Sequence, residues 1–430
     1  MHIAFIDSNP VGLGALRAAK RAGHYVTFIS SNRFAAFIGG IEAVQNAQHS
    51  DQVVQIDSSL DEEELFSALS ALSRERRLDA VVTVLDFCTH VVARCAKRLG
   101  LPGTDPDAVA LAQDKAACRA RIAARGIRSV PFALVDNLQD AKARVAEIGY
   151  PVIAKPKRGA ASLLTAKIET PEELEAYFAT LHRSLAVPQG VVETLSPETL
   201  IEGYVDGPLF SVEMAAANGE FQPMALSWRK RCIVDPSVEL GTTMPAPVSE
   251  SAAKALVDYA LTVVRSLGLD LGIFHIELIV GPDGPVLVEV NPRIMGGNIP
   301  TVFRLATGVD PFELLIGIHL SGQLPDACRT VATVRSASTR SIGPASEGRI
   351  PEVLPAGWTA PFEAQLSAWN VNLPAGALVD AMDSTYCPNH FQLVRDSSVE
   401  SSLLAEWIIS VTAQATGLSL RQSREDYLGL

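Results

Sequence analysis

Short apolar runs alternate with amphipathic segments over the first hundred residues. The runs HIAFID, YVTFIS, VVQID and AVVTVL have strand character, and helical spacing of apolar residues appears in GALRAAKRAG, from Leu60 onward and again up to Gly100. Strands that alternate with helices are typical of a parallel sheet covered by helices. We therefore predict an α/β domain over residues 1–105, which ends in the Pro- and Gly-containing stretch LPGTDPDAV.

The pattern changes after residue 106. A helix over ALAQDKAACRARIAARG and the strand VPFALV lead to PVIAKPKRGAASLLTAKI, where two strands flank a loop. TLIEGYV is a further strand, and LFSVEMAAANGEFQPMALSW reads as a hairpin because Asn-Gly is a strong signal for a tight turn. A helix over about 250–267 precedes a second hairpin, and beyond about 326 short strands and turns lead to a final helix near 398–415. Antiparallel sheets are therefore expected after the first domain.

Composition narrows the class of protein. The formal net charge of −12 and the pI near 5.2 give no basic surface, so we expect no nucleic-acid partner. The six cysteines form no C-x-x-C pair, which argues against a structural zinc site and a disulfide framework and predicts reduced, mostly buried thiols. The start MHIAFIDSNP is unlike a signal peptide, and no stretch approaches the roughly 20 apolar residues of a membrane span. A cytoplasmic protein without a membrane partner is expected.

The turn SNPVGLG after the first strand invites comparison with dinucleotide-binding turns. Gly12 and Gly14 fit the first two positions of G-x-G-x-x-G, but the third glycine is replaced by Arg17. A plain strand-to-helix turn is therefore favoured over a nicotinamide or flavin site.

Polar residues recur at alternate positions in the second hairpin, GIFHIELIVGPDGPVLVEVNPR. Alternation places Glu289, Asn291 and Arg293 on one face of a strand, and His275 and Glu277 on one face of the strand before it. A three-residue connection, Pro282-Asp283-Gly284, would set Glu277 opposite Glu289, with side chains that start only about 5 Å apart.

Two carboxylates so close repel each other unless a cation lies between them or one is protonated. With the oxygen of Asn291 they form a set of hard ligands that suits Mg²⁺. The alternative is an ordinary ion network, in which Arg293 and a lysine neutralise the two acids.

The order H-I-E, then E-V-N-P-R, then M-G-G-N resembles the metal hairpin of ATP-grasp carboxylate–amine ligases. By that resemblance Glu277, Glu289 and Asn291 hold one or two Mg²⁺ ions, with Mn²⁺ able to substitute. Arg293 is the implied catalytic residue, which stabilises charge on the transferring phosphoryl group and on the acyl phosphate.

The resemblance extends upstream to an ATP site. It implies phosphate contacts from two lysines, a phosphate-covering loop with backbone donors at Ala160 and Ala161, and a strand that reads adenine. The implied ATP-binding residues are Lys115, Lys155, Gly159, Ser162, Glu202 and Val205. Leu209 replaces the usual ribose-binding acid, for which Glu213 could substitute.

The segment VELGTTMPAP and the run NPRIMGGNIPTVFRLATGVDPFELLIG are most similar to the L-amino-acid ligase, or dipeptide synthetase, branch of this family. Thr242 stands where that branch often has histidine. The implied substrate-binding residues are Thr242, His275, Gly296 and Gly297, with Arg335 as a further candidate from the C-terminal part. For His275, orientation of Glu277 and a satisfied core position are the alternatives.

The resemblance implies an ATP-grasp fold with three parts. These are an N-terminal parallel α/β domain over 1–105, an ATP-grasp domain over 106–325 with a nucleotide lid lobe at about 131–205, and an α+β subdomain over 326–430. The implied activity joins a carboxylate, activated as an acyl phosphate, to an amine, with ADP and phosphate as products. A biotin carboxylase-like enzyme that activates bicarbonate is the alternative. The general base is left open between Glu213 and water, and a homodimer is an open alternative to a monomer.

Overall fold

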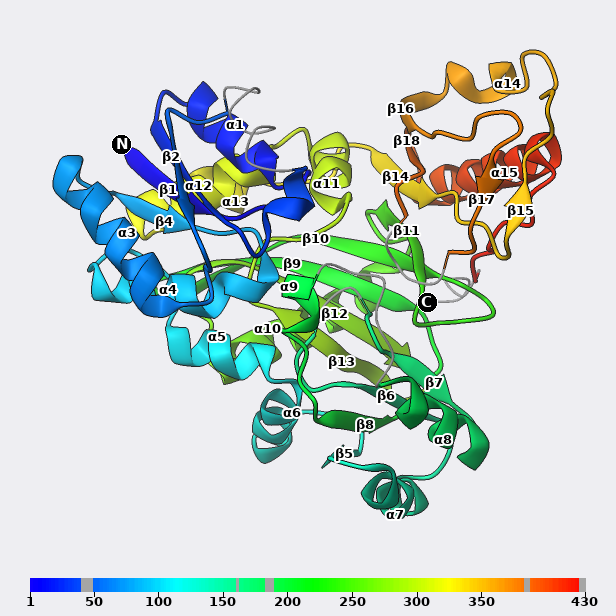
Figure 1. The fold of residues 1–430 in the computed structure, drawn as a ribbon, viewed down its shortest axis with the longest axis horizontal. Coiled ribbons are helices and arrows are strands. Elements are labelled where there is room, and N and C mark those ends of the chain that lie inside the picture. The colour runs from blue at the N-terminus through cyan, green and yellow to red at the C-terminus, as the bar shows by residue number, and fades with distance from the viewer. Residues whose placement is uncertain (40–48, 160–161, 182–188, 383–386, 425–430) are drawn as a thin grey trace.

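In the computed structural model, residues 1–39, 49–159, 162–181, 189–382 and 387–424 are described. Four parallel strands in the order β3-β2-β1-β4 form the N-terminal sheet, as the sequence predicts (Figure 1). Its elements are β1 (His2–Ile6), α1 (Leu13–Arg21), β2 (Tyr25–Ser31), η1 (Ala35–Ile38), β3 (Gln52–Ile56), α3 (Glu62–Glu75), β4 (Ala80–Val82), η2 (Asp86–Cys88) and α4 (Thr89–Arg98).

The two faces of this sheet have different partners. Ala4 and Ile6 of β1 pack with apolar residues of α3 and α4, whereas Ile3 and Phe5 join a core that includes α1 and residues of α11 (Ile299–Thr307) and α12 (Pro311–Ser321). One face of the first domain is thus covered by helices that come two hundred residues later in the chain. The N-terminal sheet thus ends before the predicted boundary near residue 105, but its hydrophobic core includes residues from beyond that boundary.

The central sheet has eight antiparallel strands in the order β13-β12-β9-β10-β11-β14-β18-β16. They are β9 (Leu209–Ala217), β10 (Glu220–Arg231), β11 (Glu239–Met244), β12 (Gly272–Gly281), β13 (Gly284–Asn291), β14 (Ser336–Ser341), β16 (Leu366–Asn370) and β18 (His390–Arg395). The sheet continues across residue 325, because β14 pairs with β11. The C-terminal part is therefore an extension of the central sheet.

Helices cover this sheet along its length. The described helices and short strands of this region are α5 (Pro106–Gln113), α6 (Lys115–Ala124), α10 (Glu250–Leu267), α13 (Asp326–Arg329), β15 (Gly348–Arg349), α14 (Ala360–Glu363), β17 (Leu378–Val379) and α15 (Ser398–Thr416). Helices α5, α6 and α10 share a core with β9, β12 and β13, while α15 packs on β14 and β18.

A small antiparallel sheet in the order β5-β8-β6-β7 forms a lobe below the central sheet in Figure 1. It contains β5 (Phe132–Val135), α7 (Leu138–Ile148), β6 (Val152–Pro156), β7 (Ala166–Ile168), α8 (Pro171–Thr180), α9 (Gln189–Val192) and β8 (Thr199–Gly203). This lobe occupies the range predicted for the nucleotide lid.

One predicted helix is wrong in the structure, and one predicted turn is confirmed. The single helix expected over ALAQDKAACRARIAARG is wrong, because Asp114 ends α5 and its side chain caps α6 by accepting from the Ala117 N–H at 3.0 Å. The Asn218-Gly219 turn is confirmed: Ala217 pairs with Glu220, and both turn residues have positive φ, of 51° and 78°.

All six cysteines are free, and five of them are buried, as predicted. In the part of the chain that the structure describes, no helix is long and apolar enough to cross a membrane.

Candidate active site

Glu277 and Glu289 of the acidic hairpin pair as predicted, although the turn between their strands differs from the predicted one. Glu277 lies opposite Glu289, but Gly281 pairs with Gly284, so the connection has two residues and not three. The register is restored by a bulge at Val288, between the Leu278–Leu287 and Glu277–Glu289 pairs. A bulge places one extra residue in one strand and turns its backbone out of the regular ladder. The bulged Val288 carbonyl accordingly accepts from two buried cations described below.

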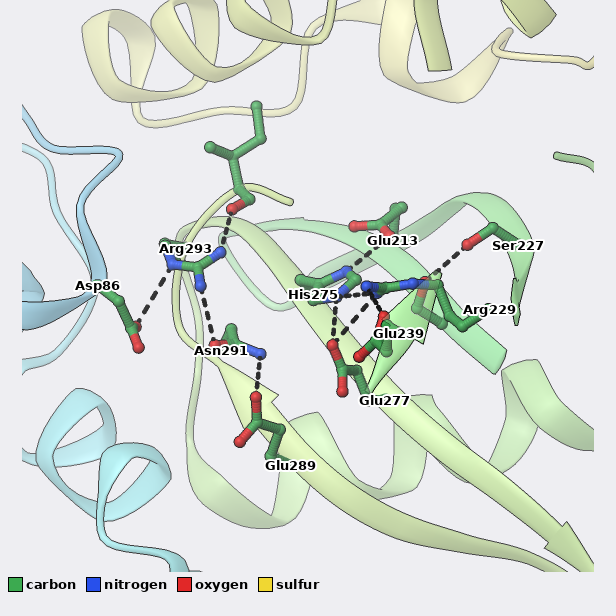
Figure 2. Close-up of polar contacts among 12 residues, drawn as sticks. Asp86, Glu213, Ser227, Arg229, Glu239, His275, Glu277, Glu289, Asn291 and Arg293 are labelled. Atoms are coloured by element: carbon green, nitrogen blue, oxygen red, sulfur yellow. Dashed lines mark hydrogen bonds and ion pairs between the residues drawn. The ribbon is translucent and has the colours of Figure 1, made fainter. Parts of the chain in front are cut away.

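Glu289, Asn291 and Arg293 form a chain of contacts along one face (Figure 2). Asn291 Nδ2 donates to Glu289 Oε1 at 3.2 Å, and Arg293 Nη2 donates to Asn291 Oδ1 at 3.1 Å. Lys115 Nζ lies 3.2 Å from Glu289 Oε2. The amide thus sits between an acid and a guanidinium, and a lysine from α6 balances the acid.

Arg293 also meets the N-terminal domain. Its Nε lies 3.4 Å from Asp86 Oδ1, in the segment that follows β4 (Figure 2). Gly296 leaves room for this guanidinium, since a Cβ there would lie 3.2 Å from Arg293 Nη1, and Gly297 has a φ of +54° that disfavours side chains. Gly296 therefore lies beside the Arg293 guanidinium, which itself contacts the segment after β4.

His275 lies inside a second set of charged side chains. Its Nδ1 is 2.7 Å from Glu213 Oε1, and its Nε2 is 2.9 Å from Glu277 Oε1. Arg229 Nη1 lies 3.2 Å from the same Glu277 oxygen, and Arg229 Nη2 also pairs with Glu239. Both ring nitrogens of the buried histidine are engaged by protein, so the geometry supports orientation of Glu277 and gives no support to a substrate contact.

These neighbours shift the pKa values of the set. Burial alone would lower the pKa of His275, but Glu213 and Glu277 outweigh it and raise the pKa to about 9. Burial opposes ionisation of Glu277, yet His275 and Arg229 lower its pKa to about 2. For Glu239 burial prevails over Arg229 and raises the pKa to about 7. Glu277 is thus held as a carboxylate at neutral pH.

Glu213 is fully buried and bonded to His275, which gives no support to its use as a ribose ligand or as a general base. Thr242 is buried on β11 directly opposite Arg229 on β10. Arg335 is exposed at the start of β14.

The predicted nucleotide residues gather around Glu202. Lys155 Nζ lies 2.7 Å from Glu202 Oε2, and Arg119 Nε donates to Glu202 Oε1 at 2.7 Å. Burial opposes ionisation of this acid, but Arg119 and Lys155 lower its pKa to about 2. Lys115 Nζ donates to the Gly159 carbonyl at 3.1 Å, which joins α6 to the loop after β6.

The remaining predicted ATP contacts are Ser162, in the loop between β6 and β7, and Val205, just after β8. Ser162 has a φ of 56°, and Val205 packs against Gly281, where a Cβ would lie 2.8 Å from Val205 Cγ1. Ala160 and Ala161, the expected backbone donors, lie outside the described residues.

Four residues of the site were not singled out from the sequence: Asp86, Arg119, Arg229 and Glu239. A signal existed for Arg119, which is four residues after Lys115 and therefore on the same helix face. Glu239 lies inside the VELGTT segment, and alternation in WRKR places Arg229 and Lys230 on opposite faces. Nothing near Asp86 in the sequence indicates its contact with Arg293.

The arrangement fits a hard cation. Among the described residues no three His, Cys, Asp or Glu side chains converge as a metal site, so a site here would rest on Glu277, Glu289 and the Asn291 oxygen. Glu277 makes its contacts to His275 and Arg229 through Oε1, which leaves Oε2 for another ligand within the described structure. Oxygen ligands that are few in number and completed by phosphate are typical of Mg²⁺.

Two family models match this chain. Residues 148–302 match the ATP-grasp domain and residues 16–103 match the ATP-grasp N-terminal domain. The fold is similar to that of an L-amino acid ligase from Bacillus licheniformis, with a TM-score of 0.76 and 20% identity, covering 98% of this chain and 99% of that one.

Two curated relatives are similar to this chain over part of their length. An uncharacterized protein of Sinorhizobium fredii is 27% identical over 292 residues, 68% of this chain and 58% of that protein. An alanine–anticapsin ligase of Bacillus subtilis is 27% identical over 350 residues, 75% of this chain and 71% of that enzyme. With both domain matches lying on the parts of the fold that meet at the acidic hairpin, the chain belongs to the ATP-grasp family of ligases.

Proposed function

We propose that this protein is an ATP-dependent carboxylate–amine ligase that activates its acid as an acyl phosphate and releases ADP and phosphate. One observation supports this most: the opposed acids Glu277 and Glu289 share a face with Asn291 and Arg293. Lys115 joins that face from α6, so acids suited to a metal lie beside cations suited to phosphate.

A carboxylate is a poor acyl donor because its leaving group would be oxide. Transfer of the γ-phosphoryl group of ATP replaces oxide with phosphate, which an amine then expels. In-line transfer crowds negative charge, and positioned cations stabilise that charge in the transition state. In this proposal Lys115 and Lys155 bind the nucleotide phosphates, and Arg293 binds the acyl phosphate.

Glu277, Glu289 and Asn291 would hold Mg²⁺, which would neutralise phosphate charge and orient the γ-phosphoryl group. His275 and Arg229 keep Glu277 ionised and oriented for that purpose.

For the substrates we propose amino acids or compounds that resemble them. The proposal rests on the named relatives, an alanine–anticapsin ligase and an L-amino acid ligase. Gly296 lies beside the Arg293 guanidinium, and we propose that Gly296 and Gly297 contact a substrate carboxylate. Thr242, which lies opposite Arg229, is the further proposed substrate contact. The acid and the amine themselves are to be found by experiment.

The test is a panel of amino acids, singly and in pairs, scored by ADP release and product mass. Glu289→Ala is measured beside Glu220→Ala, which removes an exposed acid far from the hairpin. We expect ADP release that requires both an acid and an amine and that is lost only in Glu289→Ala. Full turnover in Glu289→Ala would contradict the metal assignment, AMP and pyrophosphate would contradict the acyl phosphate, and bicarbonate-dependent release would favour the carboxylase alternative.

A further inference from the structure

Glu202 is a buried carboxylate with two cationic partners, one on each oxygen. Lys155 lies 2.7 Å from Oε2, and Arg119 donates to Oε1 at 2.7 Å. All three side chains are at most 7% exposed. One buried acid needs only one cation for neutrality, so the second cation calls for an explanation.

The two cations differ in how firmly they are held. Arg119 Nη2 also donates to the bulged Val288 carbonyl at 2.9 Å, whereas Lys155 Nζ approaches that carbonyl only to 3.5 Å. Arg119 thus binds Glu202 on β8 of the lid lobe and the carbonyl on β13 of the central sheet at the same time. Lys155, at the end of β6, has Glu202 as its one close anionic partner in the described structure.

Under the proposed function, Lys155 must transfer to a nucleotide phosphate. That move would leave Glu202 Oε2 without its partner, and a buried unpaired carboxylate is costly. Arg119 would still hold Oε1, so Glu202 would remain ionised and oriented. Oε2 would then be free to accept a hydrogen bond from the exocyclic amine of adenine.

We propose that Arg119 is a positioning residue for nucleotide binding, and that ATP binds by partner exchange. In this exchange Lys155 leaves Glu202 for phosphate, the adenine amine takes its place on Oε2, and Arg119 stays on Oε1. The inference rests on the proposed nucleotide site. It explains how the charge of Glu202 is balanced when the site is empty, and how the site selects adenine when a nucleotide is bound.

The first test uses the full-length protein with Arg119→Met, Arg119→Lys and, as a matched control on the exposed side of the same helix, Arg121→Met. ADP and IDP affinities are measured by calorimetric titration, since IDP carries a carbonyl oxygen in place of the amine. We expect Arg119→Met to bind ADP at least about tenfold more weakly, because the exchange would then leave the buried Glu202 carboxylate without any cation. The preference for ADP over IDP should shrink as well, with partial recovery in Arg119→Lys.

A residue that only stabilises the fold would weaken ADP and IDP equally, so an unchanged preference would overturn the inference. Binding by Arg119→Met that equals binding by Arg121→Met would overturn it too.

The second test is a double-mutant cycle with Glu202→Gln. If Arg119 acts through Glu202, the loss in the double variant should be smaller than the product of the two single losses. Fully independent effects would contradict the exchange. Failure of the wild-type protein to bind ADP at all would contradict the proposed function itself, which separates that failure from a failure of this inference.

Discussion

Two buried ion networks lie on opposite faces of the same central sheet. On one face Arg229 joins Glu213, His275, Glu277 and Glu239 in the candidate active site (Figure 2). Its neighbour Lys230 points the other way, to Glu406 of α15 at 2.8 Å. Consecutive residues of one strand thus serve two networks, as expected from the alternation of side chains in a strand.

The networks differ in how completely their polar atoms are paired. In the second, Arg340 binds Glu406 through Nε at 2.9 Å, and its other nitrogens donate to the carbonyls of Leu240, Ser341 and Arg421. In the first, Glu213 Oε2 and Arg229 Nε have no hydrogen-bond partner among the described residues. Unpaired buried atoms are rare in structures and call for an explanation. The network at the candidate active site thus keeps two unpaired buried atoms in the described part of the chain, whereas every guanidinium nitrogen of Arg340, which holds α15 to the sheet, has a partner.

The largest effect is expected at Arg293, between the hairpin and the N-terminal domain. Arg293→Met should lower the rate of ADP release by about 10²–10³-fold, because a preorganised cation at the transferring group is lost. The free energy of unfolding should fall by about 1–3 kcal/mol, because Asp86 and Asn291 lose a buried partner, so the two rates are compared where both proteins are folded. Steady-state kinetics beside urea denaturation measure both, and a variant that keeps the wild-type rate would contradict a catalytic role.

Glu406→Gln should show the opposite pattern. Removing this acid leaves the buried guanidinium of Arg340 without the carboxylate that it binds, which should cost about 3 kcal/mol of stability. Turnover at 25 °C should remain close to wild type as long as the protein is folded. Glu220→Gln, at an exposed pair with Arg329, is the matched control and should cost at most about 1 kcal/mol. Equal losses in the two variants would remove the distinction between buried and exposed pairs.

The contribution of Glu406 to the free energy of unfolding should depend on pH. Burial would raise the pKa of Glu406, but Arg340 and Lys230 outweigh it and lower the pKa to about 2. A carboxyl whose pKa is depressed by folding stabilises the folded state above its unfolded pKa and loses that contribution as pH falls. The stability gap between wild type and Glu406→Gln should therefore shrink between about pH 4.5 and pH 2. A gap that stays constant over this range in denaturation at several pH values would contradict the assignment.

A smaller effect is expected at Glu213, which orients His275. Glu213→Gln should raise the Mg²⁺ concentration for half-maximal activity about tenfold, because residues behind a metal ligand tune its affinity by such factors. Half-saturation by ADP should not change. An effect on nucleotide affinity alone would place Glu213 outside the metal-binding network.

Local patterns sufficed for much of the fold and for part of the site. The parallel N-terminal strands, the Asn218-Gly219 turn and the Glu277–Glu289 pairing follow from alternation and turn chemistry. The two-residue turn with a bulge at Val288 could not be distinguished from a three-residue turn, since both give the same pairing. Asp114 falls inside the predicted helix, because its role as a cap depends on where the chain bends.

The partners of the predicted residues were harder to predict. Arg229 meets Glu277 from 48 positions away in sequence, and Asp86 meets Arg293 from the other domain. Such pairs depend on strand order in the sheet and on how one sheet edge faces another. The alternation of polar and apolar residues along a single strand gives no information on strand order or on which sheet edges face each other.

The continuation of the central sheet through β14 also restricts how the C-terminal segment of such proteins can change in evolution. The matched domains end at residue 302, yet β11, which carries Glu239 and Thr242, is bounded on its far side by β14. A C-terminal segment of this kind cannot be exchanged like a separate module, because a replacement must present a strand edge that pairs with β11. Recombination among relatives would therefore alter the sheet beside the candidate active site whenever it altered the C-terminal segment.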